Sequence, residues 1–248
     1  MTKKNPTETL AADIKTISPI AYIKTDYKEK FGIPRQAGII TTLPARIVFR
    51  GEYRNPEALR GIEDFSRLWL IWGFSKIKEY TFSPTVRPPR LGGNVKMGVF
   101  ATRSPFRPNQ LGLSCVSLSK VIETDDEGVV LEVYGADLMD GTPIYDIKPY
   151  VPYADSHQDA GGGFADAPPE EKLQVNDPRE EMKKVPKEKQ EALRRLLALD
   201  PRPAYTATKD GESQKKHGMA FGGFNVVFQV EGVRLEIVEI QPESMQTR

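Results

Sequence analysis

The chain has 248 residues, of which 39% are hydrophobic and 28% charged, and its formal net charge at pH 7 is +1. This composition suffices for a packed core, and a charge so close to zero does not by itself indicate a nucleic-acid partner. No apolar run approaches the roughly 18–20 residues needed to cross a bilayer, and no signal-peptide core follows the basic N-terminus. Its one cysteine, Cys115, cannot form an intramolecular disulfide, and the chain has only two histidines. A reducing cytoplasm is therefore expected, and a metal site is not.

Residues 20–150 contain short β-like runs separated by proline, glycine and Asx turns. A short helix is expected to begin at Asn55-Pro56, because Asn can cap it and Pro suits the first helical position. Many short strands with little helix favour a β-barrel or two packed sheets, since the intervals are too short for the crossover helices of a doubly wound sheet. The expected strands are residues 20–23, 46–49, 68–74, 99–101, 113–121 and 129–134, the last two joined by a hairpin loop at 125–128.

The composition changes after Pro152. Residues 154–185 are predicted to be a linker or mobile loop, because much of this segment is rich in glycine and proline and poor in bulky apolar residues. A helix is predicted over 186–199 and a hairpin over 224–240. We therefore expect a mainly β protein, with a barrel domain over residues 14–153 and a small α+β domain over residues 186–248 packed on it.

A basic interval lies between Glu79 and Glu123, where the sequence has no Asp or Glu. Such an interval creates a local positive field even in a neutral protein. Arginine suits bidentate phosphate contacts, and the interspersed aromatic rings can stack unpaired bases. A single arginine beside a proline often only braces a loop, but the cluster as a whole favours an anionic ligand. Its members are Arg87, Arg90, Lys96, Arg103, Arg107 and Lys120.

Residues 137–150 hold three carboxylates, Asp137, Asp140 and Asp146. They could accept from a ribose, balance a cation or take a proton. Spacing alone favours a simpler interpretation, in which Asp140-Gly141 forms a turn and Asp146 pairs with Lys148. The glycines at 161–163 lack the strand–glycine–helix context of a dinucleotide loop, and no P-loop or nucleophile elbow is present. The residue patterns alone thus indicate a β-rich protein with a basic loop face.

Segments 85–94, 100–109 and 137–150 resemble, in order and spacing, the signature of the TrmO family. Segments 34–38, 60–62 and 65–69 agree with it, as does Asp200-Pro-Arg-Pro-Ala-Tyr205 near the C-terminus. The resemblance implies a β-barrel methyltransferase unrelated to the Rossmann class and working as a homodimer. It also implies methyl transfer from S-adenosylmethionine to N6 of threonylcarbamoyladenosine, beside the anticodon in the anticodon stem-loop of certain tRNAs.

The resemblance also implies which residues bind the cofactor, and the roles of other residues in the reaction are predicted beside it. Because some relatives carry His where this chain has Ser75, a backbone contact is expected there. Arg87 or Arg90 is expected to read the threonyl carboxylate of the substrate. Three candidates for taking the acceptor proton are Asp140, Asp200 and Tyr205; the alternative is that positioning suffices and solvent takes the proton. The tRNA contacts are expected at Arg87, Arg90, Arg107 and Arg202. The cofactor contacts are expected at Gln36, Ala37, Gly38, Phe74, Ser75, Arg103, Leu113, Ala136, Asp137, Leu138 and Met139.

Two other functions compete with this one. A non-catalytic RNA-binding barrel would account for the basic interval but gives no reason for the acidic loop, and it should not retain S-adenosylmethionine. An enzyme of the same fold could use the same cofactor on a different acceptor. The segment 200–205 favours tRNA, because it extends the resemblance beyond the cofactor-binding domain.

Overall fold

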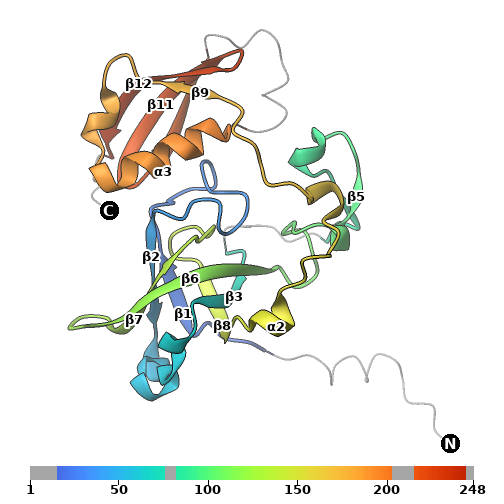
Figure 1. The fold of residues 1–248 in the computed structure, drawn as a ribbon, viewed down its shortest axis with the longest axis vertical. Coiled ribbons are helices and arrows are strands. Elements are labelled where there is room, and N and C mark those ends of the chain that lie inside the picture. Colours follow the sequence, from blue (N-terminus) through green and yellow to red (C-terminus); the bar gives the residue numbers. More distant parts are fainter. Residues whose placement is uncertain (1–15, 76–81, 203–214, 244–248) are drawn as a thin grey trace, which may run out of the picture.

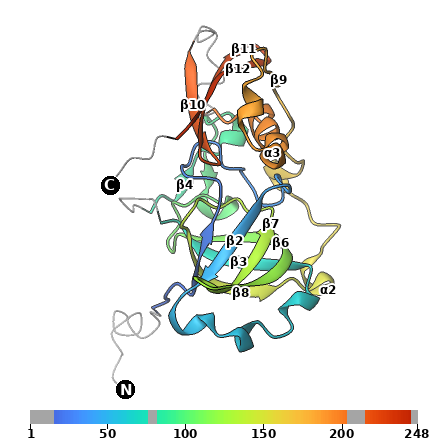
Figure 2. The same ribbon diagram turned by 90° about the vertical axis from the view of Figure 1, so that its left-hand side faces the viewer.

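A computed structural model of the chain describes residues 16–75, 82–202 and 215–243. Two domains lie one above the other, with the barrel domain below and the C-terminal domain above in the view of Figure 1. The view turned by 90° keeps this arrangement (Figure 2). The mainly β fold predicted from the sequence, a barrel with a small α+β domain, is confirmed.

Six antiparallel strands close the barrel in the order β1-β2-β7-β6-β3-β8. Alternate side chains fill its interior, and Ile23, Ile47, Leu70 and Leu131 are fully buried there, as the period of a strand requires. The strands are β1 (Ala21–Lys24), β2 (Pro44–Phe49), β3 (Arg67–Gly73), β6 (Leu111–Thr124), β7 (Gly128–Tyr134) and β8 (Pro143–Pro149).

Two elements of the barrel domain differ from the prediction. Strand β8 closes the barrel by pairing Ile144 with Ala21, but prolines at both of its ends and the charges at Asp146 and Lys148 hide it in the sequence. The expected strand at Val99–Ala101 is wrong: this segment is a 3-10 helix, η5. The short paired segments β4 (Thr85–Val86) and β5 (Met97–Gly98) precede it, and the Thr102 hydroxyl donates to the Val99 carbonyl at its end.

The segment between β2 and β3 carries three 3-10 turns, η1 (Gly51–Arg54), η2 (Pro56–Leu59) and η3 (Ile62–Asp64). The predicted start at Asn55-Pro56 is confirmed, since the Asn55 side chain accepts from the Glu57 N–H at 3.0 Å. The helix is a single 3-10 turn. Further along the chain, η4 (Pro89–Leu91), α2 (Pro152–Asp155) and η6 (Gly163–Ala165) are equally short.

The C-terminal domain packs one helix, α3 (Lys187–Ala198), against a sheet of order β10-β11-β12-β9. The predicted helix and hairpin are confirmed, with the apolar face of α3 buried and the turn at Gly232 in the left-handed region. No helix in the described ranges is long and apolar enough to span a membrane. The strands are β9 (Gln174–Asn176), β10 (Lys216–Phe221), β11 (Phe224–Glu231) and β12 (Arg234–Pro242).

Part of the segment 154–185, expected to be a linker, belongs to this domain. Strand β9 pairs in parallel with β12, and Met182 on η7 (Glu181–Lys184) is buried in the domain core. Leu173 and Val185 join the same core. These few apolar side chains are spaced among charged residues. They are enough to order the segment because the rest of the domain provides an apolar surface on which they pack.

The loop of residues 25–43, between β1 and β2, joins the two domains; we call it the bridging loop (Figure 1). Its Tyr27, Ile40 and Leu43 are buried in the core of the C-terminal domain rather than in that of the barrel. Asp26 accepts from Lys189 Nζ of α3 at 2.8 Å, and its carbonyl accepts from the Gly222 N–H at 3.0 Å. A loop of the barrel domain therefore completes the core of its neighbour.

Candidate functional site

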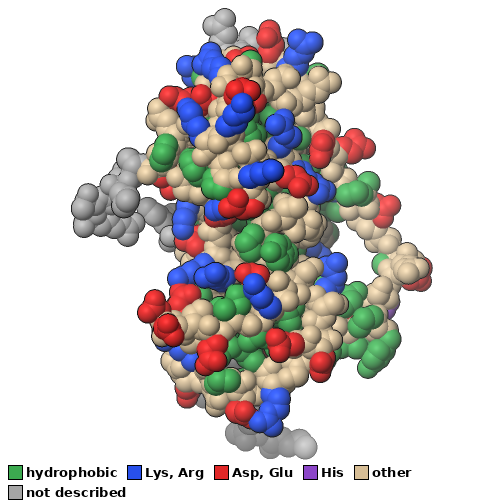
Figure 3. All heavy atoms as spheres, turned by 60° about the vertical axis from the view of Figure 1, so that its left-hand side comes forward, with side chains coloured by type: hydrophobic (Ala, Val, Ile, Leu, Met, Phe, Trp, Pro, Cys, Tyr) green, Lys and Arg blue, Asp and Glu red, His purple; other side chains and the backbone are tan. Residues whose placement is uncertain are grey.

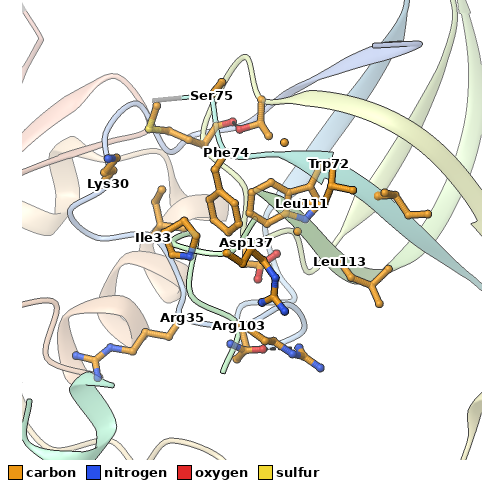
Figure 4. Close-up of a pocket in the computed structure, with 18 of the residues that line it drawn as sticks. Lys30, Ile33, Arg35, Trp72, Phe74, Ser75, Arg103, Leu111, Leu113 and Asp137 are labelled. Carbon is orange, nitrogen blue, oxygen red and sulfur yellow. Dashed lines mark hydrogen bonds between the residues drawn. The ribbon is translucent and has the colours of Figure 1, made fainter. Parts of the chain in front are cut away.

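A pocket of about 660 Å³ lies where the bridging loop meets the end of β3 and the start of β6 (Figure 4). The loop after η5 and the residues between β7 and β8 complete its wall. This volume falls within the range usual for small-molecule sites.

Aromatic rings from β3 and its end form one wall of the pocket. Trp72 and Phe74 meet edge to face, with ring centroids 4.4 Å apart. Trp72 is paired across the ladder with Gly112 of β6, where a Cβ atom would lie only 2.2 Å from the indole ring. The ring can lie against β6 only because this position has no side chain. The arrangement provides an apolar surface against which a flat ligand ring can pack.

A buried polar network joins this wall to the other side of the pocket. Trp72 Nε1 donates to Ser114 Oγ at 2.9 Å, and Ser114 Oγ donates to Asp137 Oδ1 at 2.6 Å. Ser114 is only 2% exposed. Burial raises the pKa of the Asp137 carboxyl, against the opposing effects of the hydrogen bonds from Ser114 and the Ala37 N–H and of the Arg103 charge. The carboxylate is thus placed in the pocket in spite of its loss of hydration.

Positive charge dominates the rest of the lining. Lys30, Arg35, Arg103 and Arg107 all contribute to it, whereas Asp137 is the only acidic residue among the described residues that line the pocket. Arg103 Nη1 donates to Gln36 Oε1 at 2.5 Å, which links the loop after η5 to the bridging loop. Such a lining suits a ligand that carries an anionic group at one point and a cationic group at another.

The structure brings most of the expected cofactor residues to this pocket. The four that do not line it lie directly behind: the Gly38 N–H donates to the Gly135 carbonyl at 2.8 Å, Ala37 donates to Asp137, and Ala136 and Leu138 are buried in the barrel core. Those that line it are Gln36, Phe74, Ser75, Arg103, Leu113, Asp137 and Met139.

Sequence reasoning missed Trp72, Ser114, Gly112 and Lys30. One signal was present, because Ser114 is a polar residue between apolar neighbours in a strand, where a buried hydroxyl needs a partner. The other three could be found only from the pairing of β3 with β6 and from the course of the bridging loop.

Of the three candidates for proton transfer, the two that the structure describes lie away from the pocket lining. Asp140 is absent from its lining; its carboxylate accepts from the Thr25 N–H at 3.0 Å and from Lys28 Nζ at 2.7 Å. Asp200 lies in the C-terminal domain, where its two carboxylate oxygens accept from Arg202 at 2.8 and 2.9 Å. Tyr205 lies outside the described residues. The Asp146–Lys148 pair of the simpler interpretation is present at 3.3 Å.

The four arginines expected to contact RNA also lie apart in the fold. Arg107 lines the pocket, and Arg202 is held in its buried pair with Asp200. Arg87 is exposed after β4, and Arg90 on η4 donates to the Ala167 carbonyl. The hydrogen bond from Arg90 links the β4–β5 segment to the part of the chain that leads to the C-terminal domain.

The fold is a closed antiparallel barrel extended by an α+β domain, and the pocket at the end of the barrel is lined by aromatic and cationic residues. These features define a class of small-molecule-binding proteins outside the Rossmann type. Residues 22–156 match the tRNA-methyltransferase O N-terminal domain, and residues 170–243 match the TrmO C-terminal domain. The chain belongs to the TrmO family, so the resemblance seen in the sequence is confirmed.

Individual relatives agree over nearly the whole chain. The tRNA (adenine(37)-N6)-methyltransferase of Escherichia coli K12 is 41% identical over 229 residues, which cover 90% of this chain and 96% of the relative. A putative S-adenosylmethionine-dependent methyltransferase of Pseudomonas aeruginosa, RcsF, is 41% identical over 202 residues, or 79% of this chain and 85% of the relative. The crystal structure of TrmO from P. aeruginosa superposes with a TM-score of 0.71 at 31% identity, covering 92% of this chain and 97% of the other.

Proposed function

We propose that this chain is an S-adenosylmethionine-dependent methyltransferase that acts on N6 of adenine 37 in tRNA. The observation that carries the proposal is the agreement of both domains with the TrmO family, at 41% identity to the E. coli tRNA (adenine(37)-N6)-methyltransferase over 90% of the chain. More specifically, we propose that the methyl acceptor is the threonylcarbamoylated form of this adenine.

The pocket fits S-adenosylmethionine in size and in chemistry. Trp72 and Phe74 offer aromatic faces to an adenine, Arg103 offers a bidentate partner to a carboxylate, and Asp137 offers a counter-charge to a cation. The bound cofactor supplies an electrophilic methyl group on a positively charged sulfur. We propose that the residues expected from the sequence hold it: Gln36, Ala37, Gly38, Phe74, Ser75, Arg103, Leu113, Ala136, Asp137, Leu138 and Met139.

Positioning is the main contribution that the protein's own residues make to the reaction. The walls formed by β3, β6 and the bridging loop hold the pocket in a fixed shape, and an in-line approach of the acceptor nitrogen requires such a fixed frame. The nitrogen of a urea is a weak nucleophile because its lone pair is delocalised, so a group that takes its proton adds about 10²–10⁴-fold. That Asp140, Asp200 or Tyr205 takes this proton remains a prediction.

We propose that the RNA approaches over the basic interval between Glu79 and Glu123. Arg87 and Arg90 are exposed in this interval, which also carries the exposed aromatic rings of Phe100, 72% exposed, and Phe106, 45% exposed. Such rings can stack a splayed base while the arginines contact phosphates or the threonyl carboxylate. Elsewhere on the surface, charges of both signs are interspersed, as the face in Figure 3 shows, so no second single-sign field competes on that face.

We further propose that the protein acts as a homodimer in the cytoplasm. The exposed apolar side chain of Leu113, which lines the pocket and is 49% exposed, supports a covered surface there. The single cysteine and a tRNA substrate suit a reducing compartment. Light scattering coupled to gel filtration measures the assembly state directly.

The decisive experiment incubates the protein with labelled S-adenosylmethionine and tRNA, comparing threonylcarbamoylated tRNA with the unmodified transcript, and then analyses the nucleosides. Methylated threonylcarbamoyladenosine formed only from the modified tRNA is the expected result. Cofactor binding without transfer would point to another acceptor, and no cofactor binding would favour the RNA-binding adaptor. In the same assay, near-normal turnover of Asp140→Asn at saturating substrates would eliminate Asp140 as the base.

A further inference from the structure

The hydrogen bonds from Trp72 through Ser114 to Asp137 can run in one direction only. An indole N–H can donate but never accept, so Ser114 Oγ must accept from Trp72 Nε1. The single hydroxyl hydrogen of Ser114 is therefore left for Asp137 Oδ1, 2.6 Å away. A hydroxyl committed as a donor stabilises the ionised carboxylate over its protonated form.

The negative charge of Asp137 affects which charge on a ligand the pocket prefers. Lys30, Arg35, Arg103 and Arg107 give the lining an excess of positive charge, which opposes a cationic ligand. S-adenosylmethionine carries a sulfonium charge, whereas its product S-adenosylhomocysteine is a neutral thioether with otherwise the same charges. Among the described lining residues, Asp137 is the only one with a negative charge, and this charge favours the charged donor over the spent product.

We propose that Ser114 is a positioning residue, oriented by Trp72, that keeps Asp137 ionised and directed toward the pocket so that the pocket prefers the sulfonium donor over the thioether product. This inference rests on the proposed function, because it takes S-adenosylmethionine as the ligand. It assigns to a buried serine and to a tryptophan N–H a role in product release as well as in binding.

The groups that face Asp137 define its titration. Arg103 faces it from the loop after η5, the Ala37 N–H from the bridging loop, and Ser114 from β6. Tyr27 is also close enough for its pKa to be raised, by burial first and then by Asp26 and Asp137, so the phenol stays neutral. An arginine side chain stays protonated, so Asp137 is the group among these whose charge changes when the pH is lowered.

The experiment measures the dissociation constants of S-adenosylmethionine and S-adenosylhomocysteine by calorimetry between pH 5 and pH 8.5. In the wild type, the preference for the sulfonium compound is expected to fall as the pH drops through the pKa of Asp137. In Ser114→Ala, the loss of a donor to the carboxylate moves the midpoint of this fall upward by about one pH unit. In Trp72→Phe, which keeps the Ser114 hydroxyl but not its orienting donor, the shift is smaller and in the same direction.

The matched control is Ser119→Ala on the same strand β6, where the hydroxyl is exposed and contacts Glu132 Oε1 at 3.2 Å, outside the pocket lining. This variant should reproduce the wild-type midpoint. If Ser114→Ala and Trp72→Phe both titrate like Ser119→Ala, the inference is overturned, and so it is if Asp137→Asn keeps the full preference for the sulfonium compound. A wild type that binds neither compound would instead overturn the proposed function, which separates the two failures.

Discussion

The carboxyl group of Asp137 illustrates, at the scale of a residue, a conflict between stability and ligand binding. Its pKa is raised above the ordinary value by burial, so the folded state binds the proton more tightly than the unfolded state does. The contribution of this group to stability is therefore greatest at low pH and is lost as the pH rises through the raised pKa. At neutral pH, the ionised Asp137 destabilises the ligand-free protein.

We accordingly expect Asp137→Asn to raise the midpoint of thermal unfolding of the ligand-free protein at pH 7 while weakening S-adenosylmethionine binding by about tenfold or more. Asn keeps an acceptor for Ser114 and removes the charge, while an amide donor replaces the second carboxylate oxygen. The gain in stability should shrink as the pH is lowered, since the wild-type carboxyl then becomes neutral as well. Differential scanning calorimetry at pH 7 and pH 4.5 tests this. Asp146→Asn, in an exposed pair with Lys148, is the control and should change stability by less than about 0.5 kcal/mol.

At this scale, the sequence motifs anticipated which residues the fold brings to one pocket, but not which partner tertiary pairing gives to each residue. Gln36, Arg103 and Asp137 were expected at the site, and all three line the pocket. Asp140, also within the acidic loop, forms an ion pair with Lys28 of the bridging loop instead, 112 residues away in sequence. No local pattern distinguishes these two aspartates, because the difference between them is made by a chain segment that the motif does not contain.

At the scale of an element, the β3–β6 ladder determines the shape of the pocket. Its register places Trp72 opposite Gly112 and Leu70 opposite Ser114, so one face of the ladder carries the indole and its hydroxyl partner. The pattern of residues 113–121 predicted a strand here, but a strand prediction does not include the cross-strand register, which depends on the whole barrel. Strand β8 was missed for the related reason that its identity comes from closing the barrel.

We expect Gly112→Ala to destabilise the protein by about 1–3 kcal/mol, because the new methyl group would displace the indole ring of Trp72. Displacing the ring also removes the donor to Ser114, so the affinity for S-adenosylmethionine should fall with stability. Urea unfolding and calorimetry measure the two effects. Gly98→Ala is the matched control, since a Cβ at Gly98 meets nothing within 4 Å and its backbone is not left-handed. Equal behaviour of the two variants would contradict the role given to Gly112.

At the scale of the whole molecule, the bridging loop makes the two domains one functional unit. One part of the loop lines the pocket through Lys30, Ile33 and Arg35, and another part is buried with the core of the C-terminal domain. Gly32 lies within the pocket-lining part, with φ +86°, and a Cβ there would be 2.2 Å from Met219 Sδ of β10. The C-terminal domain therefore supports a wall of the pocket.

Met219→Ala tests this coupling, because it removes the side chain against which the bridging loop is packed. Met219 is fully buried, so the free energy of unfolding should fall by about 2–5 kcal/mol. Loosening the loop should also weaken S-adenosylmethionine binding by about tenfold, which corresponds to roughly 1.4 kcal/mol of lost loop ordering.

Met182→Ala is the control: Met182 is buried in the same core on η7, which packs against β12 and α3. It should lower stability similarly and leave cofactor affinity near that of the wild type under conditions where both variants are folded. Equal loss of affinity in both variants would mean that the C-terminal core acts on the pocket through stability alone, and unchanged affinity in both would mean that the barrel holds the pocket by itself.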